Sequence, residues 1–336
     1  MTGKGGNGAS GSPGGSGGNG IDNQGLLRTD RGDDVLLFNG GSGASSGGKG
    51  GAGLLNSGTV DLGNGSNELT GTGGNAGSGS TGGTGGHGVD NQLRFQTGND
   101  VDTLICIGGS GASAGGRGGD GLRNSGTLFT ADGDDVLVGN GGTGGNGATA
   151  GNGGDGFHNT GSLDTGKGAD SITGTGNKGG NGNGTGGAGI YNSGTLNTGS
   201  SDDLITGIGG LKGSSGTNGA AIFNIGTILT GKGDDTVDAL SGGFAGLGTV
   251  DLGRGDDVLK GFGSGMFNGG SGVDQLLFSD GVYQVVASGN GFSIGTVMEV
   301  SNFETIGSAA LLGQTVALTR GVSGVLTITG TSATFL

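Results

Sequence analysis

The sequence predicts an all-β protein: a right-handed parallel β-solenoid of about nine coils, with stacked polyglycine arms of the polyproline II type and a C-terminal β cap. Glycine supplies 98 of the 336 residues and apolar residues only 29 %, which is too little apolar surface for a layered core. The same residue types recur at a regular interval along the chain, as in linear repeat proteins. The helical period is absent, so short strands and glycine turns are expected instead of helices.

The repeat is clearest between Leu122 and Leu137, where an asparagine column and an acidic column follow apolar residues. The two columns keep a constant interval of 11 residues, as from Asn124 to Asp135, and a disordered chain has no reason to keep it. We expect the asparagines to point inward and to hydrogen-bond along the stack, with a ligand-binding role as the alternative. This column comprises Asn23, Asn56, Asn91, Asn124, Asn159, Asn192 and Asn224.

Glycine-rich insertions lengthen most coils. The shortest coils have 22 residues, in two halves of 11, as from Asp235 to Asp257. Gly-Gly-x triplets in the insertions match the three residues per turn of polyproline II, so neighbouring arms could hydrogen-bond side by side; flexible linkers are the alternative. We expect an N-terminal arm at 1–20, a solenoid at 21–278, a cap, assembly or secretion region at 279–336, and arms at about 40–53, 73–88, 108–121, 140–156, 176–189 and 209–219.

Composition and charge exclude several functions. The formal net charge of −14 makes nucleic acid a poor partner, because phosphate binding needs a basic surface. No apolar run is long enough for membrane insertion, and the single Cys106 cannot form an internal disulfide. His87 lies in a glycine arm and His158 beside the asparagine column, without a nucleophile or metal cluster in a suitable context. We therefore expect a protein that is not an enzyme.

An acidic turn is the sharpest chemical signal, as in Gly-Lys-Gly-Asp-Asp at residues 231–235. Stacked coils would place its carboxylates about 5 Å apart, where like charges repel by several kcal/mol at an effective dielectric constant near 20. Calcium suits such oxygen ligands in a flexible geometry. The alternative is a solvent-exposed edge that tolerates the repulsion.

These turns resemble the calcium-binding nonapeptides of RTX, or haemolysin-type, repeat proteins, in a cyanobacterial-like variant with glycine-rich insertions. The resemblance covers one half of each coil between Leu26 and Phe278. It implies a calcium-filled β-roll and type I secretion to the extracellular space or cell surface, without a cleaved signal peptide. Asn67 and Ser201 depart from the motif. Carried over residue by residue, the implied Ca²⁺ ligands are Asp34, Asp102, Asp135, Asp170, Asp203, Asp235, Asp257 and Asp274.

The expected function is structural. A first coil without a cap exposes strand edges, which invite pairing with another chain, and head-to-tail contacts build open filaments. We therefore expect a homopolymer, head to tail and laterally through the arms, that forms an extracellular filament, sheath or surface layer. Ice binding or cell-surface adhesion is the alternative, because threonines form two files, one through Thr127 and one through Thr130.

Overall fold

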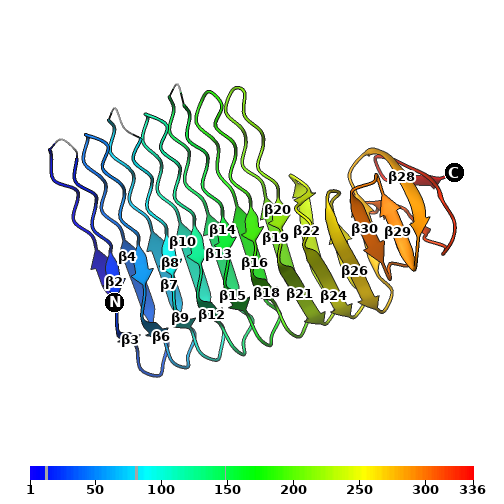
Figure 1. The fold of residues 1–336 in the computed structure, drawn as a ribbon. Coiled ribbons are helices and arrows are strands. Elements are labelled where there is room, and N and C mark those ends of the chain that lie inside the picture. Colours follow the sequence, from blue (N-terminus) through cyan, green and yellow to red (C-terminus); the bar gives the residue numbers. More distant parts are fainter. Residues whose placement is uncertain (12–13, 80–81, 148) are drawn as a thin grey trace.

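The computed structural model describes residues 1–11, 14–79, 82–147 and 149–336, and every regular element in them is a β-strand. The predicted β-solenoid is confirmed: parallel coils stack along one axis from the N-terminus, and the arms project from one side (Figure 1). As far as β23, each coil adds a strand to three sheets, here named A, B and C, and later coils continue only sheets A and C.

The strands are short and follow the repeat. Sheet A runs β1 (Thr2–Lys4), β4 (Val35–Asn39), β7 (Glu68–Thr72), β10 (Thr103–Ile107), β13 (Val136–Asn140), β16 (Ser171–Thr175), β19 (Leu204–Ile208), β22 (Thr236–Ser241), β25 (Val258–Lys260), β27 (Gln275–Phe278), β31 (Thr305–Ser308) and β32 (Thr315–Ala317). Sheet B runs β2 (Ile21–Asn23), β5 (Leu54–Asn56), β8 (Val89–Asn91), β11 (Leu122–Asn124), β14 (Phe157–Asn159), β17 (Ile190–Asn192), β20 (Ile222–Asn224) and β23 (Phe244–Ala245). Sheet C runs β3 (Leu26–Arg28), β6 (Thr59–Asp61), β9 (Arg94–Gln96), β12 (Thr127–Phe129), β15 (Ser162–Asp164), β18 (Thr195–Asn197), β21 (Thr227–Lys232), β24 (Thr249–Arg254), β26 (Gly265–Ser271), β30 (Met298–Ser301), β29 (Gly291–Ile294), β28 (Gly281–Ser288), β33 (Gly324–Thr329) and β34 (Ser332–Phe335).

The coil has three sides, whereas the sequence interval indicated two equal halves. Two three-residue strands meet at the asparagine column, because a Ser-Gly pair turns the chain directly after the asparagine, as between β11 and β12. The half that begins with the acidic column carries one longer strand, such as β13, and then the arm. The three strands enclose a narrow core.

The core consists of apolar files that run along the solenoid axis. Within each strand, burial alternates with the two-residue period of a pleated sheet, so that β13 buries Leu137 between two more exposed valines. Parallel pairing in register places Leu137 next to Leu104 and Ile172. Each file is therefore continuous from coil to coil, and a few apolar residues per coil suffice.

The arms are ordered and hydrogen-bonded, which answers the alternative of flexible linkers for their described residues. In the outgoing leg of the arm that follows β4, the N–H of Gly40 donates to the carbonyl of Thr72 (2.8 Å), at the end of β7. The N–H of Gly43 donates to the carbonyl of Asn75 (2.9 Å), in the next arm. The three-residue spacing of these bonds is that of polyproline II. The tips at residues 12–13, 80–81 and 148 lie outside the described residues.

Outgoing and returning legs form two layers joined by further backbone hydrogen bonds. The N–H of Gly119 donates to the carbonyl of Gly109 (2.8 Å) across the layers. A Cβ on Gly119 would lie 1.9 Å from the carbonyl oxygen of Gly86, closer than any side chain tolerates. By contrast, a Cβ on Gly6 would meet nothing within 4 Å. Glycine is thus required at the inward positions of the array, which accounts for much of the composition.

The repeats extend past both boundaries expected from the sequence. The strand β1 lies within the expected N-terminal arm, yet it pairs in parallel with β4. The strands β30 and β31 lie within the expected cap, yet they pair in parallel with β26 and β27. The other strands of this region, β28, β29, β32, β33 and β34, form antiparallel pairs that close sheets A and C. The last arm continues to residue 221, and β20 begins at Ile222.

Candidate functional site

The asparagine column forms a continuous buried ladder. The Nδ2 of Asn124 donates to Oδ1 of Asn159 (2.8 Å) and to the carbonyl of Ser162 (2.9 Å). The same side-chain bond links each asparagine to the next, from Asn23 through to Asn224. Because these amides are buried and bonded to one another, the geometry is that of a structural ladder and leaves no free group for a ligand.

One threonine file forms a second internal ladder. The Oγ1 of Thr130 donates to the carbonyl of Thr165 (3.1 Å), and the equivalent bonds recur along the file. Thr130 is buried, whereas Thr127 of the other file is exposed. Only one of the two threonine files therefore reaches the surface, and the flat double file of an ice-binding face is not formed.

The acidic column forms the third ladder. The backbone N–H of Asp135 donates to Oδ1 of Asp170 (2.8 Å), and Asp170 donates in the same way to Asp203 (2.8 Å). The series continues with similar bonds from Asp34 to Asp274. Asp34 stands half-buried at the first coil. The other seven aspartates of the column are buried, namely Asp102, Asp135, Asp170, Asp203, Asp235, Asp257 and Asp274.

The second carboxylate oxygen is the unusual feature of this ladder. In all seven buried aspartates, Oδ2 has no hydrogen-bond partner in the described part of the chain. Asn67, which replaces an aspartate in the same column, indicates what this atom faces: its Nδ2 donates to the carbonyls of Gly65 (2.8 Å) and Thr97 (3.1 Å). An aspartate Oδ2 at this place faces carbonyl oxygens, so a proton or a cation must lie between them.

Burial disfavours the charged form of these acids. Desolvation is the largest cause of the shift in each case, and it is partly offset by hydrogen bonds from the backbone. The pKa of Asp235 is raised for the same reason. The pKa rises to about 6 in Asp102, Asp170 and Asp274, and to about 7 in Asp135, Asp203 and Asp257.

The donor set fits the calcium ion that the RTX resemblance implies. An orphaned carboxylate oxygen and turn carbonyls are the hard oxygen ligands that Ca²⁺ takes. The turn that presents them requires positive φ two and four residues before the acid, as at Gly233 (126°) and Gly231 (100°). Non-glycine residues hold such conformations at Asp100 (82°), Ala131 (74°) and Ser201 (94°), so these departures from the motif keep the turn.

A second file of acids lines the outside of the same turns and binds in the opposite direction. The Oδ1 of Asp202 accepts the N–H of Asp234 (2.8 Å), and the Oδ1 of Asp234 accepts the N–H of Asp256 (2.8 Å). These side chains are exposed. Together, the inner and outer acids cap the backbone N–H groups on both sides of each turn.

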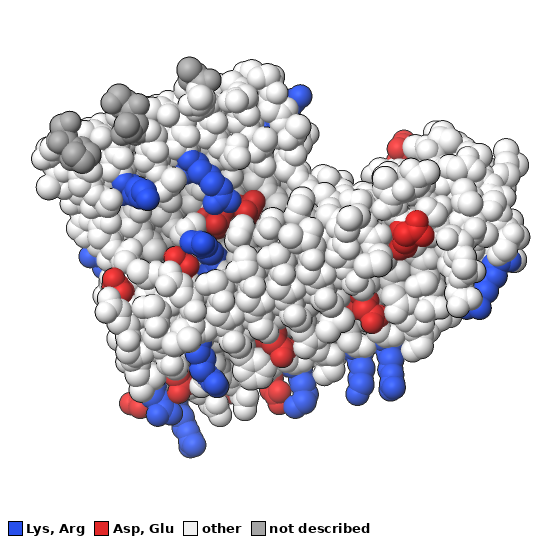
Figure 2. Space-filling model, viewed as in Figure 1, with Lys and Arg blue, Asp and Glu red and all other residues white. Residues whose placement is uncertain are grey.

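A charged cluster fills the corner where the returning legs meet sheet B, and acidic and basic side chains gather at the base of the arms in Figure 2. Arg117 contacts Asp120 (2.7 Å) and Asp155 (2.9 Å), and His158 contacts Asp155 (2.9 Å). Asp120, Asp155 and His158 are close enough to hold a metal ion. Arg117 already contacts both carboxylates, so the cluster is an ion network that ties the arms to the sheet.

Sequence reasoning missed this network. The sequence shows basic residues in the arms but not their partners, and in the structure Arg117 pairs within its own chain. The sequence did contain one sign of this network. Arg117 and Asp120 lie three residues apart at the return of one arm, and Asp155 occupies the position of Asp120 in the next repeat. Burial lowers the pKa of His87, which lies against Asp120, so this imidazole is neutral near pH 7.

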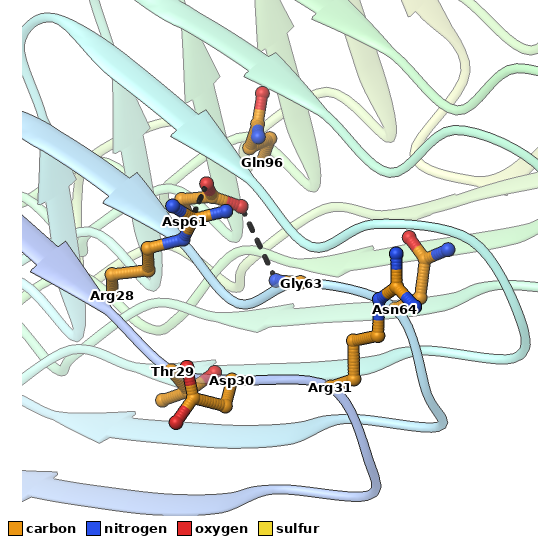
Figure 3. Close-up of a pocket in the computed structure, with 8 residues that line it drawn as sticks. All are labelled: Arg28, Thr29, Asp30, Arg31, Asp61, Gly63, Asn64 and Gln96. Atoms are coloured by element: carbon orange, nitrogen blue, oxygen red, sulfur yellow. Dashed lines mark hydrogen bonds and ion pairs between the residues drawn. The ribbon is translucent and has the colours of Figure 1, made fainter.

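A separate hollow of about 670 Å³ lies over the first turns of sheet C. Figure 3 shows Arg28 extending to Asp61, with a contact of 3.3 Å, while Asp61 also accepts the N–H of Gly63 (3.2 Å). Arg31 lies beside Asn64 at the rim (Figure 3). The hollow is lined by polar and charged groups and belongs to the open first coils, so it forms part of the N-terminal end surface.

No protein-family model matches this chain, and no curated protein matches it. The described residues include no helix long and apolar enough to cross a membrane.

Proposed function

We propose that this protein is a secreted, non-enzymatic structural subunit that assembles head to tail into an extracellular filament, sheath or surface layer. The observation that carries the proposal is the first coil. There, among the described residues, β1, β2 and β3 each have a strand partner on one side only, in all three sheets at once. Three unpaired edges on one end surface are a template for further strands.

The apolar residues of that end support pairing with a second copy. Leu26 is 65 % exposed, and Ile21 and Leu27 lie half-buried at the edge of the core. Covering several hundred Å² of apolar surface would stabilise the contact by several kcal/mol, at about 25 cal/mol per Å². The opposite end carries exposed Leu311 and Leu312 (both 89 %), so both ends expose apolar side chains.

Calcium forms part of this proposal. In extracellular fluids that contain calcium, ions on the inner aspartate file would neutralise the stacked carboxylates and join each coil to the next. The ligands would be Oδ2 of the aspartates and the carbonyls equivalent to those of Gly65 and Thr97, which Asn67 contacts in its own coil and in the next. The resemblance of the turns to RTX repeats supports the same ion and an extracellular location.

Light scattering of two matched variants tests the assembly. Leu26→Asp places a charge on the first coil edge, whereas Leu247→Asp places the same charge on a residue that is 78 % exposed in the middle of the body. We expect wild type and Leu247→Asp to form large particles in calcium, and Leu26→Asp to remain a monomer. Equal behaviour of the two variants would place the contact elsewhere.

A further inference from the structure

Three aromatic side chains stack along the outer face of sheet B. The rings of His158 and Tyr191 lie 4.4 Å apart, and those of Tyr191 and Phe223 lie 5.2 Å apart, each pair within 5° of parallel. Strand pairing places Ala245 in register after Phe223. Alanine has no ring, so the stack ends and one face of Phe223 has no aromatic neighbour.

The arm array ends at the same level. The strands β22 and β23 are joined by Gly242 and Gly243 alone, without an arm. A cavity of about 600 Å³ lies there, and we name it the missing-rung pocket. Its size is within the range of small-ligand sites. It is lined by Asp155, Thr185, Gly186, Ala188, Tyr191, Thr217, Asn218, Gly219, Ala220, Phe223, Gly242 and Ala245.

The last arm presents unused hydrogen-bonding groups to this pocket. In the preceding arm, the N–H of Gly186 donates to the carbonyl of Thr217 (2.9 Å). The corresponding N–H of Asn218 meets no further arm, and within the described chain it has no partner. The hydroxyls of Thr217 and Tyr191 and the Nδ2 of Asn218 are likewise without partners among the described residues.

The charge of the pocket points to a neutral ligand. Its single charged lining residue is Asp155, and that carboxylate is already engaged by Arg117 (2.9 Å) and His158 (2.9 Å). No lysine or arginine lines the pocket to hold a phosphate or carboxylate. An aromatic face combined with neutral donors and acceptors suits a ring that has an apolar C–H face and hydroxyl groups at its edge, because the face of an aromatic ring is negative.

We propose that the missing-rung pocket binds a pyranose ring of a neutral saccharide. The sugar stacks on the free face of Phe223 in the place of the absent ring. Its hydroxyls bond to the hydroxyl of Thr217 and to the amide groups of Asn218. The site is complete within one chain and does not depend on assembly.

Saturation-transfer NMR on the full-length protein tests this site, with D-glucose, D-galactose and N-acetyl-D-glucosamine as probes and indole as an aromatic competitor. The decisive variant is Ala245→Phe, which completes the aromatic file and fills the pocket without removing any contact. Phe223→Leu removes the stacking face. Leu55→Ala is the matched control, because Leu55 lies in the same outer file of sheet B, on β5.

We expect at least one sugar to bind to wild type and to Leu55→Ala, and its signal to disappear in Ala245→Phe while the circular dichroism stays unchanged. Phe223→Leu should weaken binding about tenfold. The proposal is overturned if no sugar binds to wild type, if a sugar signal persists in Ala245→Phe, or if indole alone occupies the pocket. A misfolded Ala245→Phe leaves Phe223→Leu to decide.

Discussion

The backbone N–H of Asn67 donates to Oδ1 of Asp102 at 2.8 Å, as the N–H of Asp102 donates to Oδ1 of Asp135 at 2.8 Å. Asparagine and aspartate are thus equivalent at the first oxygen of the ladder. They differ at the second atom, where Asn67 supplies its own N–H groups to the turn carbonyls and aspartate needs a proton or a cation.

The first prediction concerns Asp135. The variant Asp135→Asn should fold at least as stably as wild type without calcium, because the amide meets the carbonyls as Asn67 does. It should also respond less to calcium. Asp135→Ala, by contrast, leaves the N–H of Asp102 without its acceptor and should lose about 1–3 kcal/mol. Thermal melts with calcium and with chelator measure both, and a destabilised Asp135→Asn would contradict the equivalence.

The second prediction concerns pH. The inner aspartates have raised pKa values in the folded state, to about 7 for Asp135 and Asp203, so the folded chain holds more protons than the unfolded chain above about pH 4. In chelator, their contribution to the free energy of unfolding should be complete below pH 4 and be lost as the pH rises through 7. Calcium competes with these protons, so its stabilising effect should grow over the same range. Urea titrations from pH 4 to 8 check this, and a calcium effect that is independent of pH would contradict it.

The third prediction concerns the asparagine ladder. Asn192→Asp replaces the Nδ2 that bonds to Asn224 (2.9 Å) and Thr227 (3.0 Å) by an oxygen. Oxygen would then face oxygen in a dry core, at a cost of several kcal/mol. Hydrogen exchange should show the loss in the coils next to Asn192, since linear repeats couple to their neighbours. The exposed substitution Asn99→Asp is the control, and equal protection in both variants would mean that the ladder adds little.

The fourth prediction concerns the glycine arms. Gly119→Ala drives a Cβ to 1.9 Å from the Gly86 carbonyl and should disorder the neighbouring arms while the solenoid sheets keep their strand signal. Gly6→Ala meets nothing within 4 Å and should be silent. Exchange of arm amides, followed by NMR, separates the two. If these amides are equally protected from hydrogen exchange in both variants, the array is not held together by close glycine packing.

The sequence was sufficient for the solenoid because its columns repeat at fixed intervals, and each column becomes one file of side chains. The inward turn of Asn124 and the stacking of Asp135 follow directly from that register. The third side of the coil was not predictable from interval counting, because β11 and β12 are only three residues long and a Ser-Gly pair separates them.

Two other features depend on distances that the sequence does not contain. Arg117 reaches Asp155 only because two arms of similar length return to the same edge. The pocket beside Phe223 exists only because the arm array and the aromatic file end at one coil. Both result from the way repeats of unequal content align in space.

The most direct test of the proposed function is electron microscopy of the full-length protein in calcium, beside Leu26→Asp prepared identically. The account predicts filaments of wild type whose subunits join first coil to C-terminal cap, and single particles of Leu26→Asp. Wild-type protein that remains monomeric at high concentration in calcium would contradict it.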